Sequence, residues 1–434
     1  MSAAPYSRLR LCSALLLTLA LGITARLQAD EQAQASLTAQ HPAAIPDSQG
    51  SGEEILIGMS GAFSGASADL GQELKAGITA YFEHVNQTTG INGRTIRLQA
   101  YDDGYNPDPA IDNTLTLIND DEVMALLGYV GTPTVTRVLP VLDLFQDRHI
   151  YLFFPFTGAE TQRLPPYNRF AFNLRATYAQ ETAGLVDHLV AAGHRKIGVF
   201  YQIDAYGRSG WMGVRMALRR HQLAIAGETT YLRGARVGES YMAQVERLKN
   251  SGATAVISIA AYEAAAGLIR DARNSGWQVP IANVSFVNSE SLLQLLLQAG
   301  EQSDTDYTSR LINSEVVPNY RDSNLPAVRE YRQLAKGTQG EPGSAKVGFV
   351  GLEGYLNARV LVEVFRRMGD HLDRSQIPAT MNSLSDYDLG IAQELGFSPE
   401  NNQGLSRVYF NSVANEQYIT IQDWQSWAPD VETL

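Results

Sequence analysis

Threonine, glycine and proline residues follow two successive predicted strands, a pattern typical of a small-anion site. Residues 127–160 read LGYVGTPTVTRVLPVLDLFQDRHIYLFFPFTGAE, which predicts a strand, a turn, a helix, a second strand, and a second turn opening onto another helix. Thr132 lies in the first turn, and Thr157 and Gly158 lie in the second. Parallel strands end at one edge of a sheet, where open α/β folds bind ligands. Hydroxyls and helix N-terminal N–H groups at that edge suit a carboxylate.

The same two threonines can instead cap the helices that follow them, because threonine is a common N-cap residue. A capping role and a ligand-binding role are compatible. Neither GTPT nor PFTG carries an acid, a base or a metal ligand. The two turns therefore indicate a site that holds a molecule and does not transform it.

Catalytic and metal motifs are absent from the rest of the sequence. Asp102 and Asp103 are adjacent at a strand end, so their side chains point in opposite directions, and capping and solvent exposure are expected. Ser60 and Ser64 lie in a glycine-rich turn that is not a GxSxG elbow. The seven histidines form no HExxH motif, and no GxGxxG or GxxxxGK[ST] motif occurs. We therefore expect no metal, no cofactor and no enzyme activity, and a secreted hydrolase using Asp102 or Ser64 remains a remote alternative.

The composition is that of a folded, acidic protein. Of 434 residues, 44% are hydrophobic and 18% are charged, which is typical of a globular chain. The net charge of −12 argues against nucleic acid or anionic lipid as a partner.

The first residues resemble an export signal. Arg8 and Arg10 precede the apolar run LCSALLLTLALGI, and LQA offers a small-residue cleavage site at Ala29. We therefore expect a signal peptide over residues 1–29, followed by a disordered leader over residues 30–53. The expected location is the periplasm, without membrane insertion after signal cleavage.

The single cysteine, Cys12, lies inside the expected signal. Leu9, Arg10 and Leu11 precede it, whereas a lipoprotein signal requires small residues there, so no lipid anchor is expected. The mature protein would then contain no thiol, which excludes disulfides and cysteine-ligated metal.

From Ile55 onward, predicted strands and helices alternate. Apolar strand patterns alternate with amphipathic helix patterns twice over, which predicts two α/β lobes of similar size with parallel sheets. The predicted strands include residues 123–127, 170–175 and 196–201, and the predicted helices include residues 179–192 and 207–221. Two terminal strand patterns, RVYFNSV and QYITIQDW, are expected to join the second lobe, and the helix GLEGYLNARVLVEVFRRMG is expected to return to the first.

Several segments, taken in order, resemble the periplasmic solute-binding proteins of the leucine/isoleucine/valine type. The similarity runs from about Ile55 to Trp424, and its marks are IGMSGAFSGASADLGQELKAGITAYFEHVN, GINGRTIRLQAYDD, LGYVGTPT, PFTGAE, FNLRATYAQE, DAYGRSG, AAYEAAAGLIRDARNSG and GLEGYLNARVL. The resemblance implies the type 1 periplasmic binding protein fold, with two Rossmann-like α/β lobes joined by a three-segment hinge. The expected lobes are residues 54–174 with 314–405, and residues 175–313 with 406–434.

The resemblance also implies a function. A monomer would capture a small-molecule ligand in the cleft between its lobes and deliver it to an ABC transporter permease. A ligand-sensing receptor subunit for a chemoreceptor or a sensor kinase is the alternative, because the same lobes serve both uses.

Site residues can be assigned by the same resemblance. The family's carboxylate-binding serine falls on Thr132, and its second contact falls on Thr157 and Gly158. Two cleft tyrosines of the family match Tyr206 and Tyr262.

This sequence also departs from the family. The acidic residue that pairs with a ligand ammonium in amino-acid binders falls near Ser285. The cysteines of a disulfide near the cleft in some relatives are replaced by Gly104 or Tyr105 and by Gly131.

The ligand is left open by these departures. A buried ammonium without an acidic partner costs several kcal/mol, so Asp204, Glu181 or Glu263 would have to replace the missing acid. Alternatively, the ligand carries a carboxylate and no amine. The remaining candidate contacts, some of which suit an aromatic or aliphatic ligand body, are Tyr206, Tyr262, Phe286, Tyr105 and Ser64.

Overall fold

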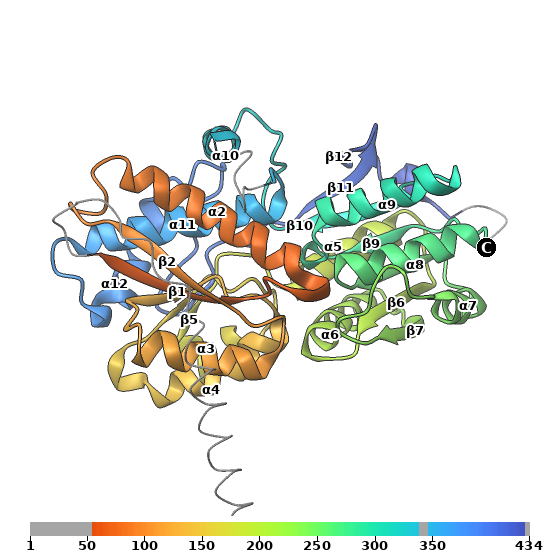
Figure 1. Ribbon diagram of the computed structural model, residues 1–434. Coiled ribbons are helices and arrows are strands. Elements are labelled where there is room, and N and C mark those ends of the chain that lie inside the picture. The colour runs from red at the N-terminus through yellow and green to blue at the C-terminus, as the bar shows by residue number, and fades with distance from the viewer. Residues whose placement is uncertain (1–53, 338–345, 430–434) are drawn as a thin grey trace, which may run out of the picture. The chain divides into compact units, whose positions relative to one another are not determined.

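The computed structural model describes residues 54–337 and 346–429. The expected signal peptide (1–29) and leader (30–53) lie outside the described residues. The described chain forms two lobes, each built on its own sheet (Figure 1).

The sheet of the first lobe has the strand order β2-β1-β3-β4-β5, and all its neighbouring pairs are parallel. Its strands are β1 (Ile55–Gly61), β2 (Ile96–Asp102), β3 (Ala125–Leu127), β4 (Leu152–Phe153) and β5 (Ala171–Phe172). Its helices are α2 (Ala68–Asn86), α3 (Pro107–Asn119), α4 (Thr132–Leu144), α10 (Pro326–Gly337), α11 (Phe349–Met368) and α12 (Ile377–Asn382).

The sheet of the second lobe has the order β12-β11-β10-β9-β8-β6-β7. Five parallel strands, β6 (Ile197–Gln202), β7 (Ile225–Tyr231), β8 (Ala255–Ile259), β9 (Ile281–Asn283) and β10 (Leu311–Glu315), are followed by an antiparallel edge of β11 (Tyr409–Ala414) and β12 (Gln417–Thr420). The helices are α5 (Tyr178–Ala191), α6 (Ala205–Arg220), α7 (Met242–Asn250), α8 (Tyr262–Asn274) and α9 (Ser289–Ser303). Every residue of β8, AVISI, is buried, as expected for a parallel strand covered on both faces.

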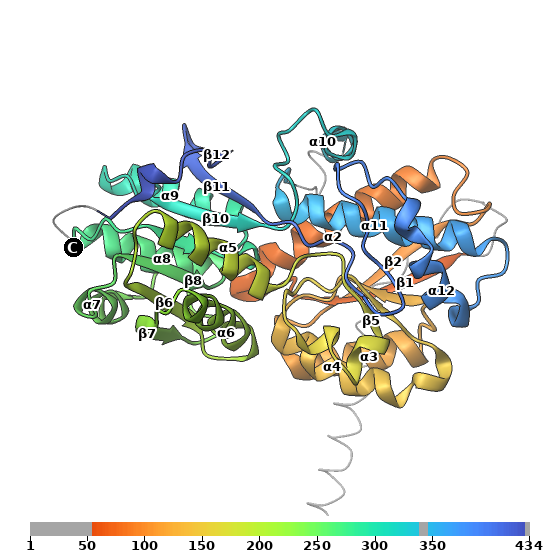
Figure 2. The same ribbon diagram turned by 180° about the vertical axis from the view of Figure 1, so that it is seen from behind.

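The chain passes between the lobes three times (Figures 1 and 2). It crosses after β5, after β10, and again before β11, so that α10, α11 and α12 return to the first lobe. The two-lobed α/β fold predicted from the sequence is confirmed. The residue limits given above for each lobe stay a prediction, and the one at residue 314 falls within β10.

Helices α2 and α11 pack closely because glycines face each other where they meet. A Cβ atom on Gly77 would lie 2.0 Å from the carbonyl oxygen of Gly351, and one on Gly354 would lie 2.2 Å from that of Leu74. Neither helix backbone can accommodate the added atom without moving. This contact holds the long returning helix against the first helix of the lobe.

Replacing Gly77 by Ala should lower the free energy of unfolding by about 1–3 kcal/mol, since overpacking a close contact costs about that much. Ala is the better helix former by about 1 kcal/mol, so a gain in stability would mean that the helices separate freely. Chemical denaturation measures the change. Gly238→Ala is the control, because a Cβ there would meet open space.

One sequence prediction about local structure is wrong. The turn at Thr157 does not open onto an α-helix, because only a 3-10 turn, Thr161–Arg163, follows it. Leu164 is followed by Pro165 and Pro166. Proline lacks the N–H group that a continuing helix needs and disfavours helical backbone in the residue before it.

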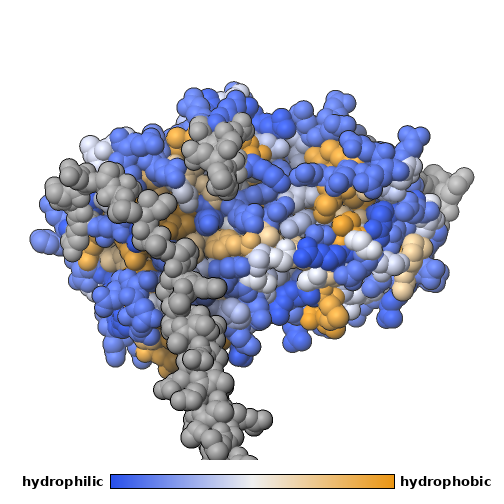
Figure 3. All heavy atoms as spheres, in the orientation of Figure 1, coloured by the Kyte–Doolittle hydropathy of each residue, from blue (hydrophilic) through white to orange (hydrophobic). Residues whose placement is uncertain are grey.

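The face of the molecule in Figure 3 is mostly hydrophilic, with apolar residues gathered in small patches. Over residues 54–337 and 346–429, none of the helices combines the length and the apolar character needed to cross a bilayer.

Candidate ligand-binding site

The turns after β3 and β4 bring Thr132 and Thr157 together. β3 and β4 are parallel neighbours, and Val130 and Phe156 continue the pairing as an isolated bridge. The two hydroxyl oxygens lie 2.7 Å apart, and both side chains are buried. We call these residues the threonine pair.

Glycine and proline shape the backbone on which Thr132 stands. Gly131 has a φ of 98°, and a Cβ atom there would lie 2.0 Å from the ring of Tyr105. Pro133 occupies the first turn of α4, where its fixed φ suits the helix. The first-turn N–H groups of a helix lack partners within it, so Thr132 stands at the positive end of α4.

Gly158 connects the threonine pair to the first crossing between the lobes. Its carbonyl oxygen accepts a 2.8 Å hydrogen bond from the N–H of Tyr178, and an added Cβ would lie 2.6 Å from that nitrogen. The Thr157 hydroxyl also accepts a 3.2 Å hydrogen bond from the N–H of Ala159. The second turn is therefore fixed by backbone contacts.

Aromatic rings from both lobes fill the space beside the threonine pair. Phe286 lies at their centre, with ring centroids 5.9 Å from Tyr105, 5.4 Å from Phe156 and 4.6 Å from Tyr206. Tyr178 adds a further ring, 5.3 Å from Tyr206. All five side chains are buried, and we call them the aromatic layer. Tyr105, Tyr206 and Phe286 were predicted site residues, whereas the sequence did not single out Phe156 or Tyr178.

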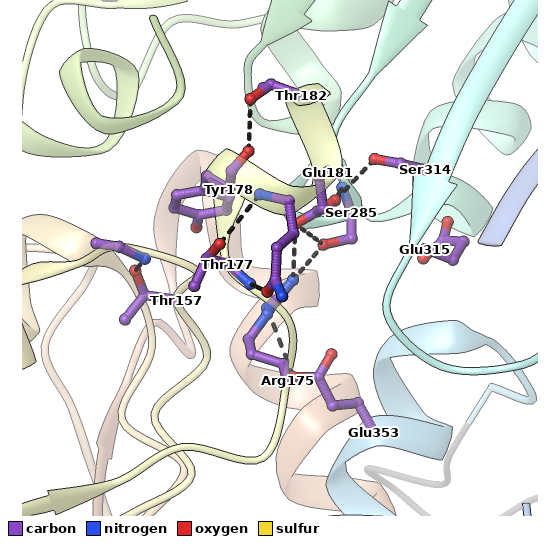
Figure 4. Close-up of polar contacts among 12 residues, drawn as sticks. Thr157, Arg175, Thr177, Tyr178, Glu181, Thr182, Ser285, Ser314, Glu315 and Glu353 are labelled. Atoms are coloured by element: carbon purple, nitrogen blue, oxygen red, sulfur yellow. Dashed lines mark hydrogen bonds and ion pairs between the residues drawn. The ribbon is translucent and has the colours of Figure 1, made fainter. Parts of the chain in front are cut away.

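Arg175 is a buried charged group beside this layer, and Figure 4 shows it among its polar neighbours. It belongs to the first crossing segment, and its guanidinium lies 4.6 Å from the ring centre of Phe156. It donates a hydrogen bond to the hydroxyl of Ser285 and lies 3.8 Å from a Glu181 oxygen and 3.5 Å from a Glu353 oxygen. Arg175 thus contacts residues of both lobes.

Burial and charge shift the pKa values in this cluster in opposing ways. Burial alone lowers the pKa of Arg175, but the surrounding groups, with Glu353 the largest contributor among them, outweigh it, so the pKa lies above its ordinary value. Burial raises the pKa of Glu353 to about 7 and also raises the pKa of Glu181 against the opposing effect of Arg175. The arginine therefore remains a cation, while the Glu353 carboxyl titrates near neutral pH.

Ser285 lies near the position that matches the family's acidic residue, and Glu181 contacts Ser285. Its carboxylate accepts hydrogen bonds from the Ser285 N–H at 2.8 Å, the Ser285 hydroxyl at 3.0 Å and the Ser314 hydroxyl at 2.7 Å. Arg175 also lies nearby, so the carboxylate of Glu181 is already bound by groups of the protein.

The other two possible acidic partners are engaged elsewhere. Asp204 is the N-cap of α6, accepting from the Tyr206 N–H at 3.0 Å and from the Gln202 side chain at 2.6 Å. Glu263 pairs with Arg236 at 3.2 Å and accepts from the N–H of Val237 at 2.8 Å.

The remaining predicted residues contact other groups. The Tyr262 hydroxyl lies 3.4 Å from the N–H of Asp69 in the first lobe, and Ser64 lies beside the exposed Asp102 carboxylate. Asp102 caps its turn as expected, but the prediction that Asp103 is solvent-exposed is wrong. Asp103 is buried, because the Ser60 hydroxyl and the Tyr105 N–H donate to it at 2.7 and 2.8 Å.

A pocket of about 360 Å³ opens next to Thr132, between the two lobes. α4 and α6, which lie next to each other in Figures 1 and 2, form its two walls. We call it the outer pocket, and its main lining residues are Thr132, Thr136, Ala205, Arg208, Met212 and Met216. A larger hollow of about 620 Å³ lies near Ile55 at the amino end of β1. Sheets of this kind bind ligands at the carboxyl ends of their strands, which lie at the other edge. Within the described ranges, no group of three or more His, Cys, Asp or Glu side chains is placed to hold a metal ion.

Comparison with known proteins decides the family. The model of the family described as "Periplasmic binding protein" matches residues 54–417. The chain belongs to the periplasmic binding protein family. Within it, the chain is of the Leu/Ile/Val-binding type, with a type 1 fold. This family consists of binding proteins.

Solved structures of periplasmic binding proteins superimpose closely on the chain. A "possible leucine/isoleucine/valine-binding protein" from Rhodopirellula baltica is 32% identical, with a TM-score of 0.78, and the match covers 88% of this chain and all of that one. A valine-bound branched-chain amino acid ABC transporter protein from Thermus thermophilus has a TM-score of 0.76, covers 86% and 96% of the two chains, and at 16% identity shows the fold alone.

Curated sequences agree with this family. An "Amino acid binding protein" of Pseudomonas aeruginosa is 24% identical over 227 residues, which is 51% of this chain and 58% of the relative's own length. The Leu/Ile/Val-binding protein of Escherichia coli K12 is 21% identical over 277 residues, covering 64% of this chain and 71% of that protein.

Arg175 and its partner Glu353 were not singled out from the sequence. A signal was available, because FNLRAT places a charged residue between an apolar strand and the capping box that starts α5. A charge in such a position is commonly buried with partners. The identity of those partners was not readable from the sequence, since Glu181, Ser285 and Glu353 lie on separate elements.

Proposed function

We propose that this protein is exported to the periplasm and captures a small carboxylic acid without an amine, in the cleft between its lobes. The threonine pair, with Thr132 at the start of α4, is the evidence for a carboxylate, because hydroxyls and helix N-terminal N–H groups bind anions. The observation that argues against an α-amino acid ligand is that the Glu181 carboxylate is already bound by groups of the protein. With three hydrogen bonds and Arg175 beside it, it offers no free charge to a ligand ammonium.

Ligand contacts on both lobes would favour the closed arrangement, since a ligand shifts a conformational equilibrium only through differential contacts. The closed form would be the one that an ABC permease recognises. The ligand would leave chemically unchanged, and a panel of esters, glycosides and phosphoesters should show no turnover. Reproducible turnover that is lost on changing Ser64 or Asp102 would contradict this part of the proposal.

A thermal-shift screen tests the ligand class. Proteinogenic amino acids, amine-free aliphatic and aromatic acids, and their amides form its three arms. A ligand present at 100 times its dissociation constant should add about 2.7 kcal/mol to the free energy of unfolding. We expect the amine-free acids to stabilise the protein, and stabilisation by amino acids alone would overturn the proposed class.

Replacing Thr132 by Ala should weaken acid binding by about 1–3 kcal/mol, because a hydrogen bond to a charged group is worth about that much. The variant should stay folded, losing only the 2.7 Å contact with Thr157. Calorimetric titration measures the affinity, and Thr132→Ser, which keeps the hydroxyl, is the control. Unchanged affinity in Thr132→Ala would remove this residue from the site.

A further inference from the structure

The volume available to a ligand body does not lie where the aromatic residues suggested. The ring of Phe286 contacts the rings of Tyr105, Phe156 and Tyr206, and all four side chains are buried. These rings therefore fill the space beside the threonine pair. The described pocket that borders Thr132 opens instead outward, along α6. A carboxylate at Thr132 would therefore point its chain toward the outer pocket.

The wall of the outer pocket on α6 is one helix face. Ala205, Ser209, Met212 and Met216 follow a spacing of three to four residues and line the pocket together. Met212 is 42% exposed and Met216 is 57% exposed. Two neighbouring exposed methionines beside a pocket form an adaptable apolar surface, because the methionine side chain is unbranched and polarisable.

The rest of the lining is mixed, because Thr132, Thr136 and Thr161 add hydroxyl groups. Thr136 lies one turn after Thr132 on α4, and Ala159 and Ala179 supply small apolar side chains. Arg208 and Glu160 are the charged residues of the lining, and both are exposed. A volume of 360 Å³ is within the range of small-molecule sites. The polar end of the pocket is thus at Thr132, and its apolar end is at the methionines.

We propose that the outer pocket holds the apolar body of the ligand, so that the protein selects carboxylic acids with an extended aliphatic or aryl chain. This inference rests on the proposed function and adds the chain-length class to it. Thr132 holds the carboxylate, and Met212 and Met216 contact the chain.

Titration of the mature protein with straight-chain acids from acetate to decanoate tests the proposal. Each CH₂ group that enters the pocket should tighten binding about fourfold. In the double variant Met212→Gln/Met216→Gln, octanoate should bind about tenfold more weakly, whereas butyrate should bind within about twofold of wild type. Leu144→Gln is the matched control, because Leu144 is 82% exposed at the far end of α4.

The outcomes separate this inference from the proposed function. If Thr132→Ala weakens butyrate but the double variant leaves octanoate unchanged, the proposed function stands and the chain does not lie in the outer pocket. If Arg208→Gln abolishes binding and Thr132→Ala does not, the ligand is reversed and the inference is wrong. If no acid binds the wild-type protein, both the proposed function and this inference are wrong.

A labelling experiment gives a second readout that does not depend on affinity. Met212→Cys introduces a thiol into a mature chain expected to have none, since Cys12 lies in the expected signal. Octanoate should slow maleimide labelling at this thiol several-fold, and butyrate should slow it little. Equal labelling rates with and without saturating octanoate would contradict the proposal.

Discussion

Replacing Arg175 by Met should lower the free energy of unfolding by about 3–5 kcal/mol at pH 8, because removing one member of a buried ion pair leaves its partners uncompensated. Glu181 and Glu353 are the carboxylates left behind, and both are buried within 4 Å of the guanidinium. Denaturant unfolding measures the loss. A change of less than about 1 kcal/mol would mean that the arginine does not hold the crossing segment in place.

The size of this effect should depend on pH in a definite direction. Burial raises the pKa of Glu353 to about 7 and that of Glu181 above its ordinary value. At pH 5 the Glu353 carboxyl is largely neutral in the folded state, so losing the cation leaves less uncompensated charge. The loss in Arg175→Met should therefore be smaller at pH 5 than at pH 8. Arg169→Met is the control, since Arg169 forms an exposed ion pair with Asp143 worth at most about 1 kcal/mol.

Replacing Glu73 by Gln should stabilise the protein by on the order of 3 kcal/mol at pH 9. Burial, followed by the nearby carboxylates of Glu290 and Asp69, raises the pKa of Glu73 from 4.5 to about 8, while Asn288 and Lys346 oppose the rise. Ionising this side chain in the folded state is costly. Glutamine keeps the shape of the side chain and removes that cost.

The direction of the pH dependence of stability follows from the number of protons that the folded and unfolded states bind. Between pH 4.5 and about 8 the folded state holds the Glu73 proton more tightly than the unfolded state, so stability falls as the pH rises through this window. The wild type and Glu73→Gln should be about equally stable below pH 4.5 and diverge above it. Denaturation at several pH values measures this, with the exposed Glu301→Gln as control. Parallel pH profiles for wild type and Glu73→Gln would show that Glu73 is ionised at little cost.

Glu73 also lies where the two lobes meet. The Ser291 hydroxyl at the start of α9 lies 3.5 Å from a Glu73 oxygen and 2.6 Å from an Asp69 oxygen, both on α2. Glu290 on α9 accepts a 3.2 Å hydrogen bond from the N–H of Phe349, at the start of α11. Polar contacts therefore join α9 to α2 and α11 here, whereas aromatic rings meet in the aromatic layer.

Local patterns in the sequence were sufficient for the two α/β lobes, whereas the three crossings between them were implied by the family resemblance. Buried strands such as AVISI and amphipathic helices such as α8 carry periodicities that do not depend on distant residues. The meeting of Thr132 and Thr157 was predictable for the same reason, because consecutive parallel strands end at one edge.

Features decided by tertiary contacts were not predictable. Asp103 is buried because Ser60, 43 positions earlier in the chain, donates to it. The rings of the aromatic layer fill the inner site because Phe156 and Phe286, from different lobes, meet. No local pattern encodes which distant side chain arrives.

The most direct test of the central claim compares an acid with its own amide. The two molecules share size and shape, but only the acid is an anion at neutral pH. Calorimetric titration of the mature protein with octanoate and with octanamide isolates the contribution of the charge. If the threonine pair and the start of α4 hold a carboxylate, octanoate should bind at least tenfold more tightly, and Thr132→Ala should reduce that preference. Equal or tighter binding of the amide would contradict the account.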